Sequence, residues 1–354
     1  MRIQARSEGT LHCRSASAGA ALTYNAGFSA IDVGKVGRGA VMELIRGVYN
    51  LHARHRGCVA TIGAFDGIHL GHQEMIRVLR ERAAEHGLPA VLLSFEPTPR
   101  EYFAKSAPPA RLTRFREKVE ALQRYGVERF VCLRFARIRS LSPERFVQDV
   151  LVDALGVRHV VVGHDFRFAR DLAGDVRTLR SLGEQAGFGV TEVPPFEIDG
   201  ERVSSSLVRQ ALDEGDMQRA ARLLGRPYRM TGKVVDGAKL GRRLGFPTAN
   251  LRPRRRATPL AGIFAIRASG CGLQDAPGVA SLGTRPTLNG TELLLEAHVF
   301  DFDGELYRQY LHVDFIARLR DELRFDDVDA LVEQMRKDAA QARRILAGAG
   351  ECDT

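Results

Sequence analysis

Short apolar runs alternate with amphipathic segments from Met42 to about residue 211. Nearly continuous apolar runs of this length are typical of strands that are buried on both faces of a parallel sheet. Five runs fit this description: Cys58–Ile62, Ala90–Phe95, Phe130–Leu133, His159–Val162 and Gly189–Val193. Between them, apolar residues recur at helical spacing in Gln73–Glu85, Phe115–Arg124 and Pro143–Leu155. This alternation predicts βαβ units and a doubly wound α/β domain with a parallel sheet.

The pattern changes after about residue 211. Glu214–Leu224 predicts a short connecting helix, which Gly225-Arg226-Pro227 would end. The next runs alternate only imperfectly, which favours a closed, Greek-key-like β-barrel over an open sheet. They are Tyr228–Val235, Gly262–Ala268, Gly278–Leu282, Leu293–Phe302 and Leu311–Ile316. The amphipathic segment Val328–Leu346 predicts a helix that closes this domain, with Asp326 or Asp327 as its N-cap.

The length of 354 residues suits two domains. We expect an α/β domain over residues 42–224, a barrel domain over 225–347 and a short tail over 348–354. Residues 1–41 are rich in Ala, Ser and Gly and show no persistent period. A transit peptide is one interpretation of this segment. We favour a disordered extension, or a start codon assigned too early with Met42 as the real beginning.

The net charge of +9 raises the question of a nucleic-acid partner, because clustered basic residues neutralise phosphates. Only six of the 52 basic residues are Lys, and the Arg residues are spread along the chain among acidic residues. A small anionic substrate such as a nucleotide explains this balance equally well, and we favour it. No run approaches the roughly 18–20 apolar residues that a membrane span requires, so a soluble protein is expected.

The cysteines are scattered, odd in number and without the spacing of a metal site. They are Cys13, Cys58, Cys132, Cys271 and Cys352. Two of them fall in apolar, strand-like runs, so we expect buried free thiols. Free thiols in turn favour a reducing cytoplasm as the compartment.

A turn joins the first apolar run to the first predicted helix. In an open α/β sheet, ligands bind beyond the carboxyl ends of the strands. The following helix N-terminus offers unpaired N–H groups and about half a positive charge to a phosphate. Glycines in the turn allow close backbone approach, and paired imidazoles can face an α-phosphate whose charge grows during attack. The turn, which predicts adenylyl transfer, contains Gly63, Gly67, Gly71, His69 and His72.

Thr61–Gln73 resembles the start of the prokaryotic bifunctional riboflavin kinase/FAD synthetases. Three further segments resemble parts of the same family: Ser94-Phe95-Glu96-Pro97, Val162–Phe168 and Val203–Arg209. The resemblance covers residues 42 to 346. It implies that the α/β domain converts FMN and ATP to FAD and pyrophosphate.

The resemblance also assigns roles to residues of this domain. It implies that His69 and His72 are catalytic and contact the ATP phosphates, and that Asp165 helps to hold the nucleotide or the flavin phosphate. Further nucleotide contacts are implied for Gly63, Phe65, Asp66, Gly67 and Gly71. A clamp for the leaving pyrophosphate, in which a guanidinium can bind bidentately, is implied for Ser204, Ser205 and Arg209. The serines can also form the N-cap of the next helix, and the two roles are compatible.

Three residues depart from the family pattern. Ala64 stands where many members have Asn, Ala169 replaces a frequent Gly, and Leu172 replaces a frequent Arg. The change at Leu172 puts one phosphate or loop contact in question. A kinase whose adenylyltransferase half is weakened is therefore an alternative to a fully bifunctional enzyme.

The second half of the chain carries a glycine-rich segment, Gly237–Asn250, which is neither a Walker loop nor a protein-kinase loop. Its glycines and Lys239 can approach phosphate oxygens, while Thr248 and Asn250 alternate on one side of an extended stretch. Magnesium keeps several waters and takes few protein ligands beside substrate phosphates. Neutral Thr and Asn oxygens can complete such a shell, so the segment predicts a phosphate and metal site.

This segment resembles the motif that holds Mg–ATP in riboflavin kinases, where a Glu on a later strand activates the riboflavin hydroxyl. Glu296 matches that Glu, although a solvent-facing strand position is the structural alternative. Gly283–Thr287 and Arg320-Asp321-Glu322 match as well, which implies that Arg320 and Glu322 lie near the flavin. Phosphate contacts are implied for Gly237, Lys239, Gly241, Gly245 and Pro247, and metal contacts for Thr248 and Asn250.

The sequence thus favours a Mg²⁺-dependent cytoplasmic enzyme that uses ATP to convert riboflavin to FMN and then FMN to FAD. Its expected partners are these small molecules, without a nucleic acid or a membrane. An Arg-rich nucleic-acid-binding protein with a retained nucleotide fold is the alternative from another class. The sequence specifies neither the oligomeric state nor whether FMN passes directly between the domains.

Overall fold

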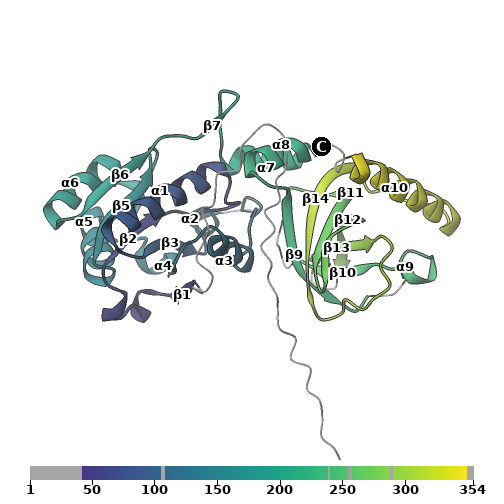
Figure 1. Ribbon diagram of the computed structural model, residues 1–354, viewed down its shortest axis with the longest axis horizontal. Helices are drawn as coiled ribbons and strands as arrows, with labels where there is room; N and C mark the ends of the chain where they lie inside the picture. The colour runs from purple at the N-terminus through teal and green to yellow at the C-terminus, as the bar shows by residue number, and fades with distance from the viewer. Residues whose placement is uncertain are drawn as a thin grey trace, which may run out of the picture.

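The computed structural model describes residues 42–104, 108–237, 240–253, 255, 257–287 and 290–348. The expected N-terminal extension, Lys239 and most of the expected tail lie outside these residues. An α/β domain and a β-barrel domain lie side by side (Figure 1). Both predicted architectures are confirmed.

The α/β domain is built on a six-stranded parallel sheet with the order β1-β4-β3-β2-β5-β6. The strands are β1 (Glu43–Arg46), β2 (Cys58–Ile62), β3 (Ala90–Glu96), β4 (Arg129–Arg134), β5 (Val157–Gly163) and β6 (Gly189–Val193). From β2 the chain builds the sheet in one direction through β3 and β4, and then in the other through β5 and β6. The strand order therefore reverses at β2, where an open α/β sheet forms its ligand crevice.

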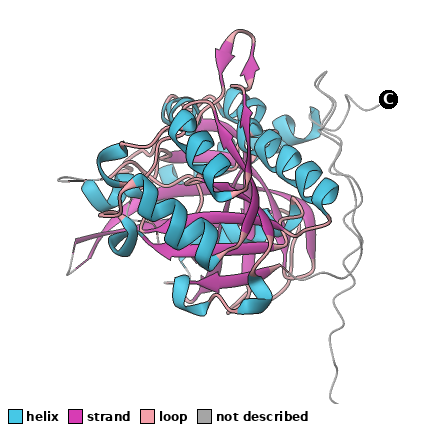
Figure 2. Ribbon diagram, turned by 90° about the vertical axis from the view of Figure 1, so that its left-hand side faces the viewer, coloured by secondary structure: helices cyan, strands magenta, loops and turns pink. Residues whose placement is uncertain are grey.

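Helices cover both faces of this sheet. On one face, α1 (Leu70–His86) and α3 (Phe115–Arg124) share buried clusters with the strands. On the other face lie α5 (Pro143–Phe146), the π-helix Val147–Ala154 and α6 (Val176–Ala186). The shorter helices are α2 (Pro99–Phe103), α4 (Phe135–Ile138) and the 3-10 turns Val48–Asn50, Ala53–His55 and Arg170–Leu172. A small hairpin of β7 (Glu197–Ile198) and β8 (Glu201–Arg202) projects from the domain (Figure 2).

The barrel closes in the order β10-β13-β12-β11-β14-β9, with β10 paired to β9. All neighbouring strands are antiparallel. Their bounds are β9 (Tyr228–Val235), β10 (Ala249–Arg252), β11 (Gly262–Gly270), β12 (Leu273–Thr287), β13 (Gly290–Val299) and β14 (Tyr310–Arg320). The helix α10 (Val328–Gly348) lies against the outer face of β11, β12 and β14, and α9 (Leu240–Arg243) is a single turn.

The imperfect alternation of the barrel strands has a physical cause. From Leu293 to Val299, β13 alternates strictly between buried and half-buried residues. Its half-buried side includes Leu294 as well as Glu296, because this outer face is partly covered rather than open to water. An outward position there tolerates an apolar residue, which blurs the alternation in the sequence. The predicted strand Leu293–Phe302 was displaced by three residues, since β13 begins at Gly290 and ends at Val299.

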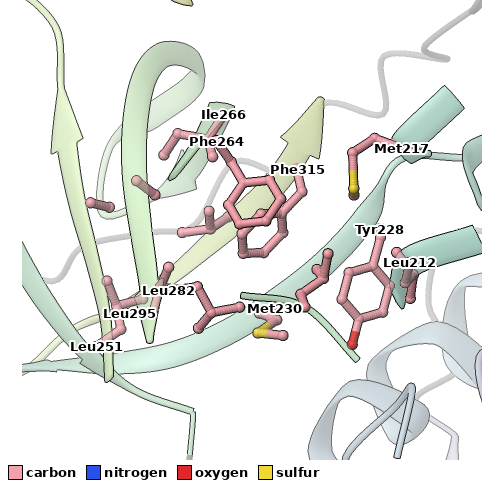
Figure 3. Packing of buried hydrophobic residues seen from close by; sticks show 14 of the residues in the cluster. Leu212, Met217, Tyr228, Met230, Leu251, Phe264, Ile266, Leu282, Leu295 and Phe315 are labelled. Atoms are coloured by element: carbon pink, nitrogen blue, oxygen red, sulfur yellow. The ribbon is translucent and has the colours of Figure 1, made fainter. Parts of the chain in front are cut away.

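Two helices, α7 (Ser205–Asp213) and α8 (Met217–Leu224), connect the sheet to the barrel. The apolar core of the barrel continues into them: Leu212 and Met217 belong to one cluster with Tyr228 and Phe315 (Figure 3). The predicted division at residue 224 stays a prediction, and the largest apolar core runs across it.

Candidate active sites

The first cavity, of about 480 Å³, lies beyond the carboxyl ends of β2 and β5. This is where the reversal of strand order places a ligand crevice. Besides backbone and apolar groups, its wall brings together residues that the sequence predicted from three distant segments. These are Asp66, His69, Gly71, His72, Asp165, Ser204, Ser205 and Arg209.

The turn 63–72, which we call the phosphate turn, has an irregular backbone. Phe65, Gly67 and Ile68 have positive φ angles of 47°, 86° and 46°. Phe65 and Ile68 are fully buried, and a Cβ on Gly67 would lie 2.8 Å from Leu112 Cδ1. A Cβ on Gly63 would lie 3.1 Å from the Phe65 ring. Gly63, Phe65 and Gly67 thus shape the turn against the protein core and do not line the cavity.

The two histidines stack at the start of α1, with ring centroids 3.7 Å apart and planes inclined by 22°. Neither Nδ1 atom has a hydrogen-bond partner among the described residues. Burial, aided by Arg202 and Arg209, lowers the pKa of His69 to about 4. Burial, followed by His69 and Lys118, holds the pKa of His72 well below its usual value. Both imidazoles are therefore neutral at neutral pH, with unpaired nitrogens at a helix N-terminus that faces the cavity.

The carboxylate of Asp66 is bonded by other groups of the protein. Its carboxylate accepts N–H bonds from Leu112 and Thr113 at 3.1 and 2.9 Å, and it pairs with the Arg209 guanidinium. Arg209 also donates to the carbonyl groups of Ala110 and Ser205, at 2.7 and 3.1 Å. Asp66 thereby fixes the position of Arg209 at the cavity wall.

The serine segment forms the predicted N-cap of α7. Ser204 is the N-cap of α7, since its Oγ accepts the N–H bond of Leu207 at 3.2 Å. Ser205 Oγ donates to the carbonyl of Asp66 at 2.8 Å and so ties α7 to the phosphate turn. Ser206 is exposed and lines the same cavity, although the sequence reasoning did not single it out.

Several cations escaped the sequence reasoning, among them Arg100 and Arg111 in the cavity wall. Arg202, at the end of the β7–β8 hairpin, lines the cavity and pairs with Asp165. Lys118 is buried and donates from Nζ to the carbonyl of Ala64 at 2.6 Å, and burial lowers its pKa. A basic residue directly before the serine motif was a usable signal for Arg202. Nothing in the local sequence marks Lys118, because its partner lies in a distant segment.

The departures from the family pattern have structural consequences. Ala169 has a φ of 67°, a conformation that favours glycine, which explains why Gly is frequent at this position. Leu172 also has a positive φ, and its side chain is 60% exposed at the cavity. Ala64 has no polar side chain, but its carbonyl group accepts the hydrogen bond from Lys118 Nζ. Ala169 and Leu172 thus place a strained backbone and an exposed apolar side chain in the loop beside the cavity.

The second cavity, of about 450 Å³, lies between the outer face of the barrel and α10. Its wall contains six of the residues predicted for the kinase site: Gly241, Thr248, Asn250, Glu296, Arg320 and Glu322. Strand register explains part of this assembly, because Asn250 on β10 and Ser281 on β12 both pair with Glu296 on β13. Side chains at paired positions point to the same face of a sheet.

The glycine-rich segment packs tightly around these residues. A Cβ on Gly237 would collide with the Asn250 amide, and one on Gly241 would collide with the carbonyl of Phe246. Gly245 has a φ of 84° just after α9. Gly245 and Pro247 do not line the second cavity, although the Pro247 carbonyl accepts a bond from His298 Nδ1 at 2.8 Å. His298 lines the cavity and was not predicted.

Arg320, Glu322 and several apolar residues line the part of this cavity next to α10. Arg320 binds Asp338 of α10 through Nε and Nη2, at 2.6 to 3.1 Å. A side chain at Gly283 would collide with the Glu322 carboxylate, so this glycine makes room for that acid. Apolar residues from the loop after β14 and from α10 complete the wall: Leu323, Phe325, Leu331 and Met335. The amphipathic pattern of α10 was a usable signal for the last two.

Within the part of the chain that the structure describes, no group of three His, Cys, Asp or Glu residues could hold a metal ion. Thr248 and Asn250 instead offer neutral oxygens beside the Glu296 carboxylate in one cavity. This donor set fits Mg²⁺ that is bound mainly through substrate phosphates and water. No described helix is both long and apolar enough to cross a membrane.

A parallel sheet with a histidine-bearing helix N-terminus at its switch point, joined to a barrel with a glycine-rich loop, defines a two-domain nucleotide-dependent transferase. Two family models match: FAD synthetase over residues 51–207 and riboflavin kinase over residues 224–346. The chain belongs to the family of bifunctional riboflavin kinase/FMN adenylyltransferases. Its function is accordingly flavin-nucleotide synthesis, with both activities on one chain.

Relatives match over almost their whole length. A bifunctional riboflavin kinase/FMN adenylyltransferase of Pseudomonas fluorescens is 48% identical over 308 residues, which cover 86% of this chain and 98% of that protein. The enzyme of the same name from Escherichia coli K12 is 42% identical over 307 residues, with the same coverage. A crystal structure described as a macrolide-efflux protein from Streptococcus pneumoniae is 30% identical, with a TM-score of 0.74 and coverage of 86% and 99%. That likeness extends over both domains.

Proposed function

We propose that the barrel cavity phosphorylates riboflavin and that the cavity of the α/β domain adenylylates the resulting FMN. In the barrel, Glu296 accepts the proton of the riboflavin hydroxyl as that oxygen attacks the γ-phosphate of ATP. The bond from the γ-phosphorus to the bridging oxygen breaks, and ADP leaves. The pairing of Glu296 with Asn250 across β10 and β13 carries this proposal, because it sets a base beside a metal ligand. Thr248 and Asn250 would hold Mg²⁺, which neutralises charge on the phosphates when bound.

In the α/β domain, a phosphate oxygen of FMN attacks the α-phosphate of ATP, and pyrophosphate leaves. The unpaired, neutral imidazoles of His69 and His72 supply donors at the N-terminus of α1, where negative charge develops. Arg209 and Arg202 face the same cavity and provide positive charge for the departing pyrophosphate. Ser206, exposed on that wall, adds a hydroxyl donor.

One assay tests both assignments. The protein is incubated with riboflavin, ATP and Mg²⁺, and FMN and FAD are separated and quantified. Glu296→Gln is expected to lower the rate of FMN formation by roughly 10²–10⁴, the usual contribution of a general base, while riboflavin still binds. His72→Ala is expected to stop FAD formation and to spare FMN formation.

The two variants control each other. FAD formation from added FMN should survive in Glu296→Gln, since that reaction does not use the kinase base. An unchanged rate constant for FMN formation in Glu296→Gln would refute the base. Parallel loss of both products in His72→Ala would show that the two cavities do not divide the reactions.

A kinase with weakened adenylyl transfer is a second candidate, which the strain at Ala169 and the exposed Leu172 favour. In the same assay it would accumulate FMN with little FAD. Restoring the family residues with Ala169→Gly and Leu172→Arg should then raise the FAD yield. Equal yields with and without these changes would reject this candidate.

We also propose that the chain acts on small molecules in the cytoplasm without a nucleic-acid partner. Many described arginines are neutralised within the fold, as in the pairs Arg111–Glu101 and Arg343–Asp301. A chain whose arginines are paired presents less free positive charge to a phosphate backbone. Binding to DNA or RNA that weakens steeply with salt would contradict this proposal.

A further inference from the structure

Arg255, in the loop after β10, is a buried cation at the seam between the domains. Its side chain is only 1% exposed. One terminal nitrogen, Nη2, pairs with Glu117 on α3 at 2.6 Å. The other, Nη1, donates to the carbonyl groups of Arg111 and Leu112 at 2.6 and 3.1 Å. A residue of the barrel domain therefore bonds the segment of the α/β domain that lies against the phosphate turn.

Those two carbonyls belong to peptide groups that also bond Asp66, a residue of the first cavity wall. The peptide between Arg111 and Leu112 accepts from Arg255 through its carbonyl and donates to Asp66 through its N–H. The peptide between Leu112 and Thr113 does the same. We call these two groups the linking peptides. Because each is planar and trans, its C=O and N–H point in opposite directions, so it bridges the two side chains.

The bridge continues to the cavity wall. Asp66 pairs with Arg209, which lines the cavity, and Thr113 Oγ1 accepts the N–H bond of Gly67 at 2.6 Å. A cation on one side of a peptide group and an anion on the other polarise it in the same sense, and hydrogen bonds in such chains strengthen one another. Arg255 thus reinforces the bonds that hold Asp66, and through it Arg209 and the phosphate turn.

The partner of Arg255 is anchored from both domains. Glu117 accepts the N–H bond of Thr231 on β9 at 2.9 Å and that of Arg114, the N-cap of α3, at 2.7 Å. Tyr228 donates from its hydroxyl to the Leu112 carbonyl at 3.2 Å. The linking peptides are therefore fixed relative to the barrel.

We propose that Arg255, a residue of the kinase domain, is a positioning residue for adenylyl transfer in the other domain, acting through the linking peptides on Asp66 and Arg209. The inference rests on the function proposed for the first cavity. Arg255 does not line either cavity, so its effect is indirect. Misplacing a group that stabilises the transition state by about 1 Å can cost on the order of 10²-fold in rate.

The test uses the full chain and measures FAD formation from added FMN beside FMN formation from riboflavin. Arg255→Met is expected to lower the kcat of FAD formation by roughly 10- to 100-fold and to leave FMN formation within about twofold. Arg255→Lys keeps the charge but not the planar guanidinium, so its kcat of FAD formation should lie between those of Arg255→Met and the unaltered protein. Arg343→Ala, which removes an exposed ion pair of the barrel, is the control and should change neither activity.

Arg255→Met leaves Glu117 buried without its cation, which can weaken the fold. Adding Glu117→Gln removes that charge, and this double variant should fold and show the same selective loss of FAD formation. A double-mutant cycle with Asp66→Asn separates positioning from general structure. If Arg255 acts through Asp66, Arg255→Met should lower FAD formation by less than about twofold in the Asp66→Asn background.

Equal loss of both activities, unchanged FAD formation, or additive effects in the cycle would each overturn the proposal. Arg209→Ala distinguishes its failure from that of the proposed function. If Arg209→Ala leaves FAD formation unchanged, the function proposed for Arg209 fails and this inference fails with it. If Arg209→Ala abolishes FAD formation and Arg255→Met does not, only the inference about Arg255 fails.

Discussion

The imidazoles of His69 and His72 are neutral in the wall of the first cavity, which also contains Arg202 and Arg209. A neutral imidazole costs less to bury than an imidazolium, and it leaves the cavity without two further positive charges while no anion is bound. When a polyphosphate enters, its negative charge favours protonation of the same rings. The pair can therefore match its charge to its ligand.

This arrangement predicts a pH dependence of stability. In the unfolded chain a histidine binds a proton below about pH 6.5, whereas folded His69 does so only below about pH 4. The unfolded state binds more protons between these values, so stability is fully present above pH 6.5 and falls as the pH drops toward 4. His69 alone should remove about 2 kcal/mol of unfolding free energy between pH 7 and pH 5.

Urea unfolding at both pH values checks this prediction. His69→Gln should lose less stability than the unaltered protein on going from pH 7 to pH 5. His86→Gln, which replaces an exposed imidazole at the other end of α1, is the control and should keep the full pH dependence. The same pH dependence in both variants would contradict the explanation.

Residue roles could be anticipated only where the chemistry is local. The histidine pair stands in a motif whose spacing predicts its task, whereas the role of Glu296 was implied only by the resemblance of its segment to riboflavin kinases. Asp66 and Lys118 could not be assigned in this way, because their partners Thr113 and Ala64 are 47 and 54 positions away. Long-range hydrogen bonds leave no periodic trace in a sequence.

At the scale of elements, α7 carries Arg209 to the cavity, and its N-terminus depends on one side chain. Ser204 Oγ satisfies the N–H group of Leu207, which would otherwise be unpaired. Ser204→Ala should therefore lower the free energy of unfolding by about 1 kcal/mol. Urea titration measures the difference.

Ser206→Ala is the matched control, because Ser206 is exposed and does not cap α7. It should change stability by less than about 0.5 kcal/mol. Equal destabilisation by both substitutions would show that capping is not the cause.

Elements with continuous or strictly periodic apolar residues were predictable. The four inner strands β2, β3, β4 and β5 follow from burial, and the edge strand β6 was predicted as well. The helices α3 and α10 follow from their amphipathic spacing. The short edge strand β1 was missed, since four residues give too little pattern. The helix α6 was also missed, although Asp175 as its N-cap and Gly187 as its stop are both visible in the sequence. The predicted helix Pro143–Leu155 forms, but from Val147 it is a π-helix, which apolar spacing does not distinguish.

At the scale of the whole molecule, every described helix and strand begins after Met42, and the two family matches start at residues 51 and 224. A chain that begins at Met42 should therefore keep both activities and the melting temperature of the full chain. The measurement is FMN and FAD formation together with a thermal melt. Loss of either activity would assign a role to residues 1–41.

The core cluster that joins Leu212 and Met217 to Tyr228 and Phe315 has a consequence for inheritance. A gene split between residues 224 and 225 would produce two fragments. Each fragment would expose an apolar surface that the other fragment covers in the intact chain. Such fragments tend to aggregate before they meet. Selection would therefore resist fission of the gene, and the two enzymes would pass down a lineage as one unit even where a cell could use them separately.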